Sequence, residues 1–171
     1  MARKLVSRRT IVKTGLLGIG ACAAASMTGL TGIFGTEAQA KGKFKINRTP
    51  EEWKKRLGGA RYRILRREGT ERPYSSPLNN EKRKGVYACA GCNLGLYKSD
   101  TKYDSGTGWP SFWAPIKGRV GTSVDYKIGY RRTEVHCGRC GGHQGHIFSD
   151  GPKPTGERHC INGLALRFIP A

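Results

Sequence analysis

Short apolar runs separated by glycine, proline, asparagine and aspartate fill the chain from Gly85 onward. Runs of this length between turn-forming residues are typical of β-strands. The pattern predicts strands at residues 86–88, 123–126, 128–130, 133–135 and 164–168. No long helical pattern occurs in this part, so we expect a mainly β, antiparallel domain.

One or two short helices are expected at the N-terminal edge of this domain. Thr49 suits an N-cap, Pro50 suits the first turn, and the two glutamates that follow face the positive end of the helix dipole. The apolar face includes Leu57, and the pair Gly58–Gly59 predicts the end of the helix. Residues 62–67 are expected to be extended.

The first 40 residues have the pattern of an export signal. Basic residues come first, a glycine-rich apolar stretch follows, and Ala38-Gln39-Ala40 matches a signal-peptidase site. The run from Ser7 to Lys13, with its Arg8-Arg9 pair, resembles a twin-arginine signal. We therefore expect residues 1–40 to be cleaved after Ala40 and the protein to be exported to the periplasm. An uncleaved membrane anchor and lipid attachment at Cys22 are the alternatives.

Length and charge constrain the rest of the chain. A chain of 171 residues suits a single domain, which we place at residues 49–171 after a flexible basic leader at 41–48. The chain has 31 basic and 12 acidic residues. Without residues 1–40 it keeps 26 basic and 11 acidic residues, a net charge of +15. This excess favours anionic partners, but its scattered distribution is also typical of an ordinary basic surface.

Two CxxC pairs predict a structural metal site. Each pair closes a tight turn that directs two thiolates to one point, and two such turns form the tetrahedral sulfur cage that Zn²⁺ prefers. The ligands would be Cys89, Cys92, Cys137 and Cys140. The glycines at 91, 138 and 141 are expected to permit these turns, and the strands before each pair to deliver them. Two disulfides, or one redox-active pair, are the competing interpretations.

The long gap between the two pairs carries a further expectation. Ordinary zinc ribbons separate their pairs by roughly 15 to 20 residues. Here a longer insertion, residues 93–136, lies between them, and we expect it to carry the working surface.

Cys160 stands apart from both pairs and is the candidate nucleophile. Arg158 and His159 place positive charge beside it, which is expected to lower the pKa of the thiol. In a strand, Arg158, Cys160 and Asn162 would share one face. The competing interpretation is a buried structural cysteine.

Two further groups complete the candidate chemistry. His143 and His146 are suited to general acid–base catalysis, although metal ligation is the alternative because they closely follow Cys140. The turn-rich loop at residues 103–113 presents Trp109, which is expected to form a pocket wall rather than core.

These segments together resemble the type B methionine sulfoxide reductases. The resemblance covers nearly all of residues 50–169, in the family's order, and rests on residues 70–73, 89–92, 102–112, 137–152 and 158–162. It implies two antiparallel sheets, one structural zinc ion and reduction of methionine-R-sulfoxide, free or in oxidised proteins. It also implies roles for six residues: Cys160 as nucleophile, Trp109 as the methyl-binding wall, His143 and His146 at the sulfoxide oxygen, and Arg158 and Asn162 as residues that set charge and geometry.

One position departs from the pattern of many members. Where they carry a resolving cysteine, this chain has Thr107. We therefore expect a one-cysteine cycle, in which a thioredoxin-like or other external thiol reduces the sulfenic acid at Cys160. A monomer without a specific nucleic-acid partner is expected. The rival hypothesis is a basic zinc module that binds nucleic acid or another anionic polymer, and a third is a peroxidase-like repair protein acting on other oxidised sulfur.

Overall fold

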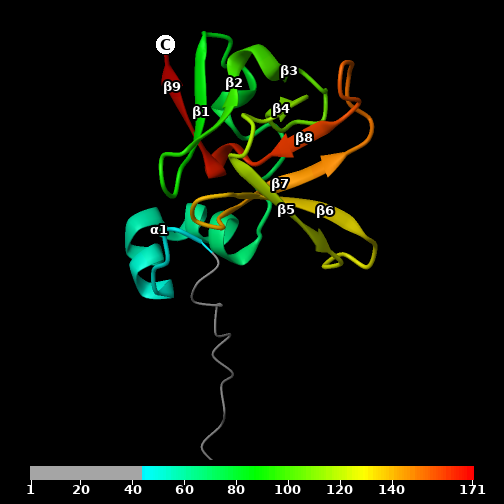
Figure 1. Ribbon diagram of the computed structural model, residues 1–171. Helices are drawn as coiled ribbons and strands as arrows, with labels where there is room; N and C mark the ends of the chain where they lie inside the picture. The colour runs from blue at the N-terminus through cyan, green and yellow to red at the C-terminus, as the bar shows by residue number, and fades with distance from the viewer. Residues whose placement is uncertain (1–43) are drawn as a thin grey trace, which may run out of the picture. The chain divides into compact units, whose positions relative to one another are not determined.

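The computed structural model describes residues 44–171 (Figure 1). The predicted signal peptide, its cleavage site after Ala40 and Cys22 lie outside these residues, as does the start of the predicted leader. Within residues 44–171, no helix has the length and apolar character needed to cross a membrane.

Within the described residues, one α-helix precedes the sheets. Helix α1 spans Pro50–Arg67, and Thr49 is its N-cap as predicted. The Thr49 hydroxyl accepts a hydrogen bond from the Glu52 N–H, and the Glu52 carboxylate accepts one from the Thr49 N–H at 2.8 Å. This reciprocal pair satisfies two N–H groups that have no partner within the helix.

The predicted end of this helix was partly wrong. Gly58 does interrupt the helical geometry, with φ of 69°, but the helix continues beyond it to Arg67. Residues 62–67, expected to be extended, are therefore helical. Ile64 and Leu65 are fully buried there, so burial of this apolar face against the domain outweighs the helix-breaking tendency of the glycine pair.

Two antiparallel sheets follow, as predicted. The smaller sheet has the order β2-β1-β9, and its strands are β1 (Gly85–Cys89), β2 (Gly95–Lys98) and β9 (Leu166–Pro170). The larger sheet has the order β3-β4-β8-β7-β6-β5 (Figure 1). Its strands are β3 (Lys102–Tyr103), β4 (Ser111–Phe112), β5 (Val120–Asp125), β6 (Arg132–Cys137), β7 (His143–Phe148) and β8 (Arg158–Ile161). Short 3-10 helices are η1 (Pro77–Asn79), η2 (Ser99–Thr101) and η3 (Gly163–Ala165).

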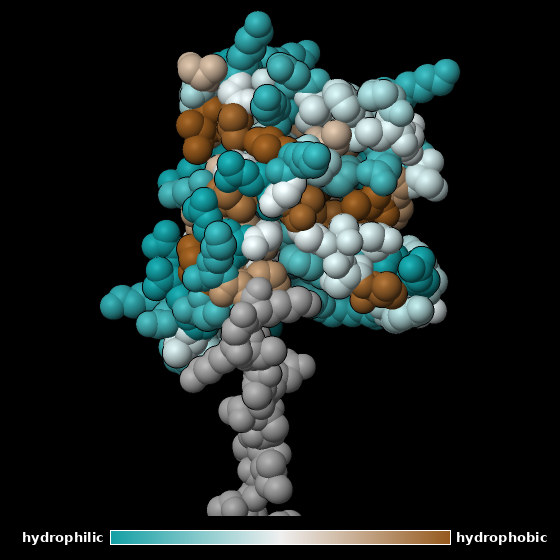
Figure 2. Space-filling model, viewed as in Figure 1, coloured by the Kyte–Doolittle hydropathy of each residue, from teal (hydrophilic) through white to brown (hydrophobic). Residues whose placement is uncertain are grey.

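Most predicted strands are confirmed, and one is wrong. Residues 86–88 and 133–135 lie within β1 and β6, and residues 123–125 lie within β5. Residues 164–168 begin in η3 and continue into β9. Residues 128–130, however, form the turn between β5 and β6. The apolar side chains of this turn face solvent, and Figure 2 shows apolar surface at the end of the hairpin.

An aromatic cluster joins the two sheets. Tyr97 of β2 stacks on Phe112 of β4, with ring centroids 4.3 Å apart. Tyr87 of β1 meets the same Phe112 ring edge-on at 4.9 Å. All three side chains are fully buried. Aromatic pairs in such geometries add to the free energy of burial, so this cluster fixes the smaller sheet against the β4–β8 edge of the larger one.

The end of the predicted flexible leader is packed against the domain. The Ile46 N–H donates to the Arg139 carbonyl at 3.1 Å, and the Ile46 side chain contacts the core. Phe44 meets the His136 ring edge-on at 5.6 Å. Phe44 and Ile46 are thus half-buried beside the second CxxC turn, whereas Lys45, Asn47 and Arg48 are exposed.

Candidate active site and metal site

The four paired cysteines form one buried cluster. Cys89, Cys92, Cys137 and Cys140 are all buried, and their sulfur atoms lie within 4.8 Å of one another. Sγ–Sγ distances are 3.8 Å for Cys89–Cys140 and 3.5 Å for Cys92–Cys137. A tetrahedral zinc ion with Zn–S bonds of about 2.3 Å requires sulfurs about 3.8 Å apart. The cluster therefore fits one structural zinc ion, as the sequence predicted.

The strands deliver these thiols as predicted, but the turns differ in detail. Strand β1 ends at Cys89 and β6 ends at Cys137. Gly141 has φ of 66°, whereas the left-handed residue after the first pair is Asn93, with φ of 59°. Gly91 and Gly138 are not left-handed, so the expectation that both need glycine's conformational freedom was wrong. Each turn is instead closed by main-chain bonds, such as Gly141 N–H to the Cys137 carbonyl.

Cys160 lies on β8, between strands β4 and β7. It pairs with Ser111 of β4 on one side and with His146 of β7 on the other. A pocket of about 140 Å³ opens here, and Cys160, His146, Trp109 and Asn162 all line it. The predicted nucleophile is therefore half-buried at a small pocket, not sealed in the core.

Two groups contact the Cys160 sulfur. Burial raises the pKa of the Cys160 thiol, and the positive charge of Arg158 and hydrogen bonds from Thr107 and Arg158 lower it only in part. The prediction of a lowered pKa is therefore not supported, because the desolvation of a half-buried thiol outweighs these contacts. Arg158 is itself fixed by two bonds to the Asp150 carboxylate, at 2.8 and 2.9 Å.

His159, expected to add charge beside the thiol, lies on the opposite face of β8. Its ring contacts the Tyr97 hydroxyl and the Glu157 carboxylate, each at 3.2 Å. Burial lowers the pKa of His159. Alternation along the strand separates it from Cys160, so it stabilises the core rather than the thiolate.

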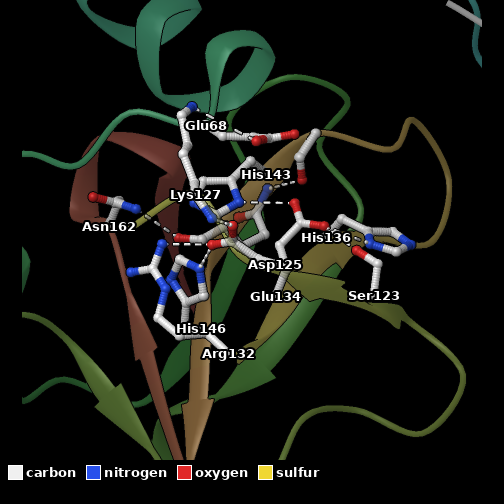
Figure 3. Close-up of polar contacts among 12 residues, drawn as sticks. Glu68, Ser123, Asp125, Lys127, Arg132, Glu134, His136, His143, His146 and Asn162 are labelled. Carbon is white, nitrogen blue, oxygen red and sulfur yellow. Dashed lines mark hydrogen bonds and ion pairs between the residues drawn. The ribbon is translucent and has the colours of Figure 1, made fainter. Parts of the chain in front are cut away.

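His146 lines the pocket, and its ring contacts Asp125, which in turn binds Arg132 (Figure 3). Its Nε2 lies 2.7 Å from the Asp125 carboxylate, which also accepts a bond from Arg132. Burial lowers the pKa of His146, against the raising effect of Asp125. Burial would raise the pKa of Asp125, but hydrogen bonds from Lys127, His146 and Arg132 lower it to about 2. Asp125 is thus an anion that orients the imidazole.

His143 stands in a second, deeper group. Its Nδ1 lies 2.8 Å from the Glu134 carboxylate, which also pairs with His136 and accepts a bond from Ser123 (Figure 3). Only 2% of His143 is exposed, and it does not line the pocket. Its ring packs edge-on against His146 at 5.3 Å. Of the two predicted histidines, the structure therefore brings His146 to the pocket and leaves His143 behind it.

Trp109 and Asn162 are positioned by one segment. The Glu71 carbonyl accepts the Trp109 indole N–H at 3.2 Å, and the Glu71 N–H donates to the Asn162 side-chain carbonyl at 2.9 Å. The Glu71 carboxylate accepts the N–H groups of Gly163 and Leu164. Since Glu71 is buried, this residue couples the pocket wall to the chain that follows Cys160.

The insertion between the CxxC pairs contributes only part of the working surface. Trp109, Thr107, Asp125, Arg132 and Glu134 come from it, but Cys160 and both histidines lie after it. Asp125, Arg132 and Glu134 were not identified from the sequence as site residues. Asp125 pairs with Arg132 across the β5–β6 hairpin, and Glu134 is two residues further along β6. Charged side chains that share one face of two predicted neighbouring strands are the signal that could have identified them.

Comparisons with known proteins agree on one family. The SelR domain matches residues 57–170. A peptide methionine sulfoxide reductase MsrB from Leptospira interrogans is 50% identical over 126 residues, which are 73% of this chain and 96% of that protein.

Two further relatives carry the same name. The one from Agrobacterium fabrum is 49% identical over 127 residues, covering 74% of this chain and 94% of its own. The one from the archaeon Methanosarcina barkeri is 52% identical over 124 residues, covering 72% and 87%. With a matching domain over most of the chain and half of the aligned residues identical, this protein belongs to the MsrB family of peptide methionine sulfoxide reductases, which are oxidoreductases.

Proposed function

We propose that this protein reduces methionine-R-sulfoxide, free or in oxidised proteins, with Cys160 as the nucleophile. The observation that carries this proposal is the pocket itself. A half-buried thiol that contacts Arg158 and Thr107 shares a volume of about 140 Å³ with an imidazole and an indole. Family membership supports the same reaction.

The reaction begins with proton transfer to the substrate. The Asp125 carboxylate engages Nε2 of His146, and Nδ1 makes no hydrogen bond to any residue within 44–171. Protonated His146 can therefore donate from Nδ1 to the sulfoxide oxygen, which makes the sulfur electrophilic. The Cys160 thiolate attacks that sulfur and forms an S–S bond. The hydroxyl then moves from the substrate sulfur to the Cys160 sulfur as the S–S bond breaks, and methionine leaves. The substrate gains two electrons, and the thiol becomes a sulfenic acid.

Three contacts in the pocket would select one sulfoxide epimer, and we propose the R epimer because the family resemblance implies it. Cys160 defines the side of attack, His146 the position of the oxygen, and Trp109 the surface for the methyl group. A chiral sulfur with three fixed contacts has one productive orientation. The zinc ion holds the two CxxC turns together and has no part in these steps.

The sulfenic acid is returned to the thiol from outside the chain. The residue at the Cys160 sulfur is Thr107, and the described cysteines other than Cys160 belong to the buried cluster. A small or thioredoxin-like thiol attacks the sulfenic acid and releases water, and a second thiol then reduces the mixed disulfide. This is a one-cysteine cycle.

The test uses the zinc-loaded protein with dithiothreitol and the separated R and S epimers of N-acetyl-methionine sulfoxide. We expect turnover of the R epimer only, and loss of this turnover in Cys160→Ser. The Cys22→Ser variant is the matched control and retains full activity. S-selective turnover, or turnover that survives Cys160→Ser, contradicts the proposal. Salt-sensitive nucleic-acid binding without reductase activity would instead favour the rival zinc module.

We also propose export through the twin-arginine route, on the basis of residues 1–40 alone. Export in the folded state would let zinc bind the thiols in a reducing compartment first. The test is a fusion of residues 1–45 to a reporter that is active only after export. Replacement of Arg8 and Arg9 by lysine should abolish export, whereas export that persists in this variant contradicts the route.

A further inference from the structure

A second hollow adjoins the active-site pocket. It has a volume of about 330 Å³ and lies between the start of β6 and the end of β7. Arg132 and Phe148 line both this hollow and the pocket that holds Cys160. The two spaces are therefore neighbours that share two side chains.

The two spaces differ in volume, so they can hold different parts of a substrate. Clefts that bind ligands commonly have volumes of about 300 to 1,000 Å³. The active-site pocket, at about 140 Å³, is large enough only for the end of one side chain. The remainder of a polypeptide substrate must lie outside it, and the larger hollow begins where the pocket ends.

The rim of this hollow has exposed apolar side chains. Tyr130 lines it and is 58% exposed, although it is a large aromatic residue. Val124, Tyr126 and Ile128 of the same hairpin are also more than half exposed. Exposed aromatic side chains next to a cleft are typical of binding surfaces.

The charged residues that line the hollow are Arg131, Arg132 and one acid, Glu157, whose carboxylate lies 3.2 Å from the His159 ring. The two arginines outnumber this acid, so the hollow favours an anionic occupant. Arg131 is exposed on its wall, and within residues 44–171 it makes no hydrogen bond or ion pair. Arg132 gives one end of its guanidinium to Asp125, but its Nε is buried without a partner among the described residues. The guanidinium of Arg132 is thereby held at the boundary between the hollow and the active-site pocket.

We propose that this hollow binds the residues flanking methionine sulfoxide in an extended polypeptide, and that it selects acidic and aromatic side chains there. The inference rests on the proposed reductase function. The anionic side chain pairs with Arg131, and the apolar one packs on Tyr130 and Phe148. The hollow thus raises kcat/KM for peptides that carry these flanking residues relative to a single capped residue.

The test compares substrates and hairpin variants with dithiothreitol as the reductant. One substrate is capped methionine-R-sulfoxide. The others are pentapeptides with the sulfoxide at the centre: one set carries aspartate and phenylalanine beside it and the other carries lysine and phenylalanine, with the charged residue placed on either side in turn. The variants are Tyr130→Ser and Arg131→Glu. Tyr126→Ser is the matched control, because Tyr126 belongs to the same hairpin and is 64% exposed but does not line the hollow.

We expect the wild-type protein to prefer the aspartate peptide over the lysine peptide by about tenfold in kcat/KM for at least one side, and this preference should shrink with salt. Arg131→Glu should abolish or reverse the preference. Tyr130→Ser should lower the ratio of peptide to capped-residue kcat/KM about fivefold, mainly through KM, while Tyr126→Ser changes the ratio by less than about twofold.

The outcomes separate the two proposals. If the wild-type protein does not reduce the capped residue, the proposed function fails. If it does, but peptides show no charge preference on either side and Tyr130→Ser behaves like Tyr126→Ser, only the flanking site is wrong.

Discussion

Replacement of the buried Glu71 carboxylate should destabilise the protein and slow the reaction together. The two oxygens of Glu71 accept the N–H groups of Gly163 and Leu164, the latter at 2.9 Å, and only 5% of Glu71 is exposed. Glu71→Gln keeps the shape but turns one acceptor into a donor. One of the two buried N–H groups then faces an NH₂ group.

The expected magnitude follows from these contacts. A buried N–H without a partner costs about 1 to 3 kcal/mol, and the remaining bond loses the charge that makes it about twice as strong as a neutral one. We therefore expect Glu71→Gln to lower the free energy of unfolding by about 2 to 4 kcal/mol. The same segment positions Trp109 and Asn162, so its movement should also lower kcat/KM at least about tenfold.

Urea unfolding of the zinc-loaded protein, followed by tryptophan fluorescence, measures the first effect, and R-sulfoxide turnover under native conditions measures the second. Glu68→Gln is the matched control. Glu68 lies three residues away and makes an exposed ion pair with Lys127 at 3.7 Å, which should contribute less than about 1 kcal/mol. A loss below about 0.5 kcal/mol in Glu71→Gln, or a loss no larger than in the control, would refute the reasoning.

Three further predictions follow from the site. Thr107→Cys, in a Cys22→Ser background, should form a disulfide with Cys160 after one turnover, because Thr107 contacts the Cys160 sulfur; mass spectrometry that finds only sulfenic acid contradicts this proximity. Burial lowers the pKa of His146 and raises that of Cys160. The reaction needs protonated His146 and ionised Cys160. As the pH increases, kcat/KM should therefore rise up to the pKa of His146, stay level between the two pKa values, and fall above the pKa of Cys160. In His146→Gln the small remaining rate should instead rise with pH through the pKa of Cys160, and an unchanged profile would exclude His146 as the acid. Removal of zinc by a chelator, or Cys137→Ser, should abolish the cooperative thermal transition or lower Tm by more than about 10 °C, since structural zinc contributes directly to folding; an unchanged Tm after confirmed metal loss would refute a structural role.

The amino-acid sequence by itself determined features whose chemistry is local. The spacing within each CxxC pair places two thiols in one turn, so the four zinc ligands could be identified without knowing how the strands pair. Thr49 and Glu52 cap a helix through bonds three residues apart, and such contacts depend on neighbouring residues alone. The unpaired Cys160, with Arg158 two residues away, was recognisable for the same reason.

The tertiary structure alone decided which groups meet across strands. Asp125 reaches His146 only because β5, β6 and β7 pair in a particular register, and a one-residue shift would turn these side chains to the other face. Register likewise places His146 at the pocket and His143 behind it. Burial decided the rest: it raises the pKa of Cys160 despite the nearby cation, and it keeps residues 62–67 helical beyond a glycine break. Both effects depend on how much water the folded chain excludes, which no local pattern specifies.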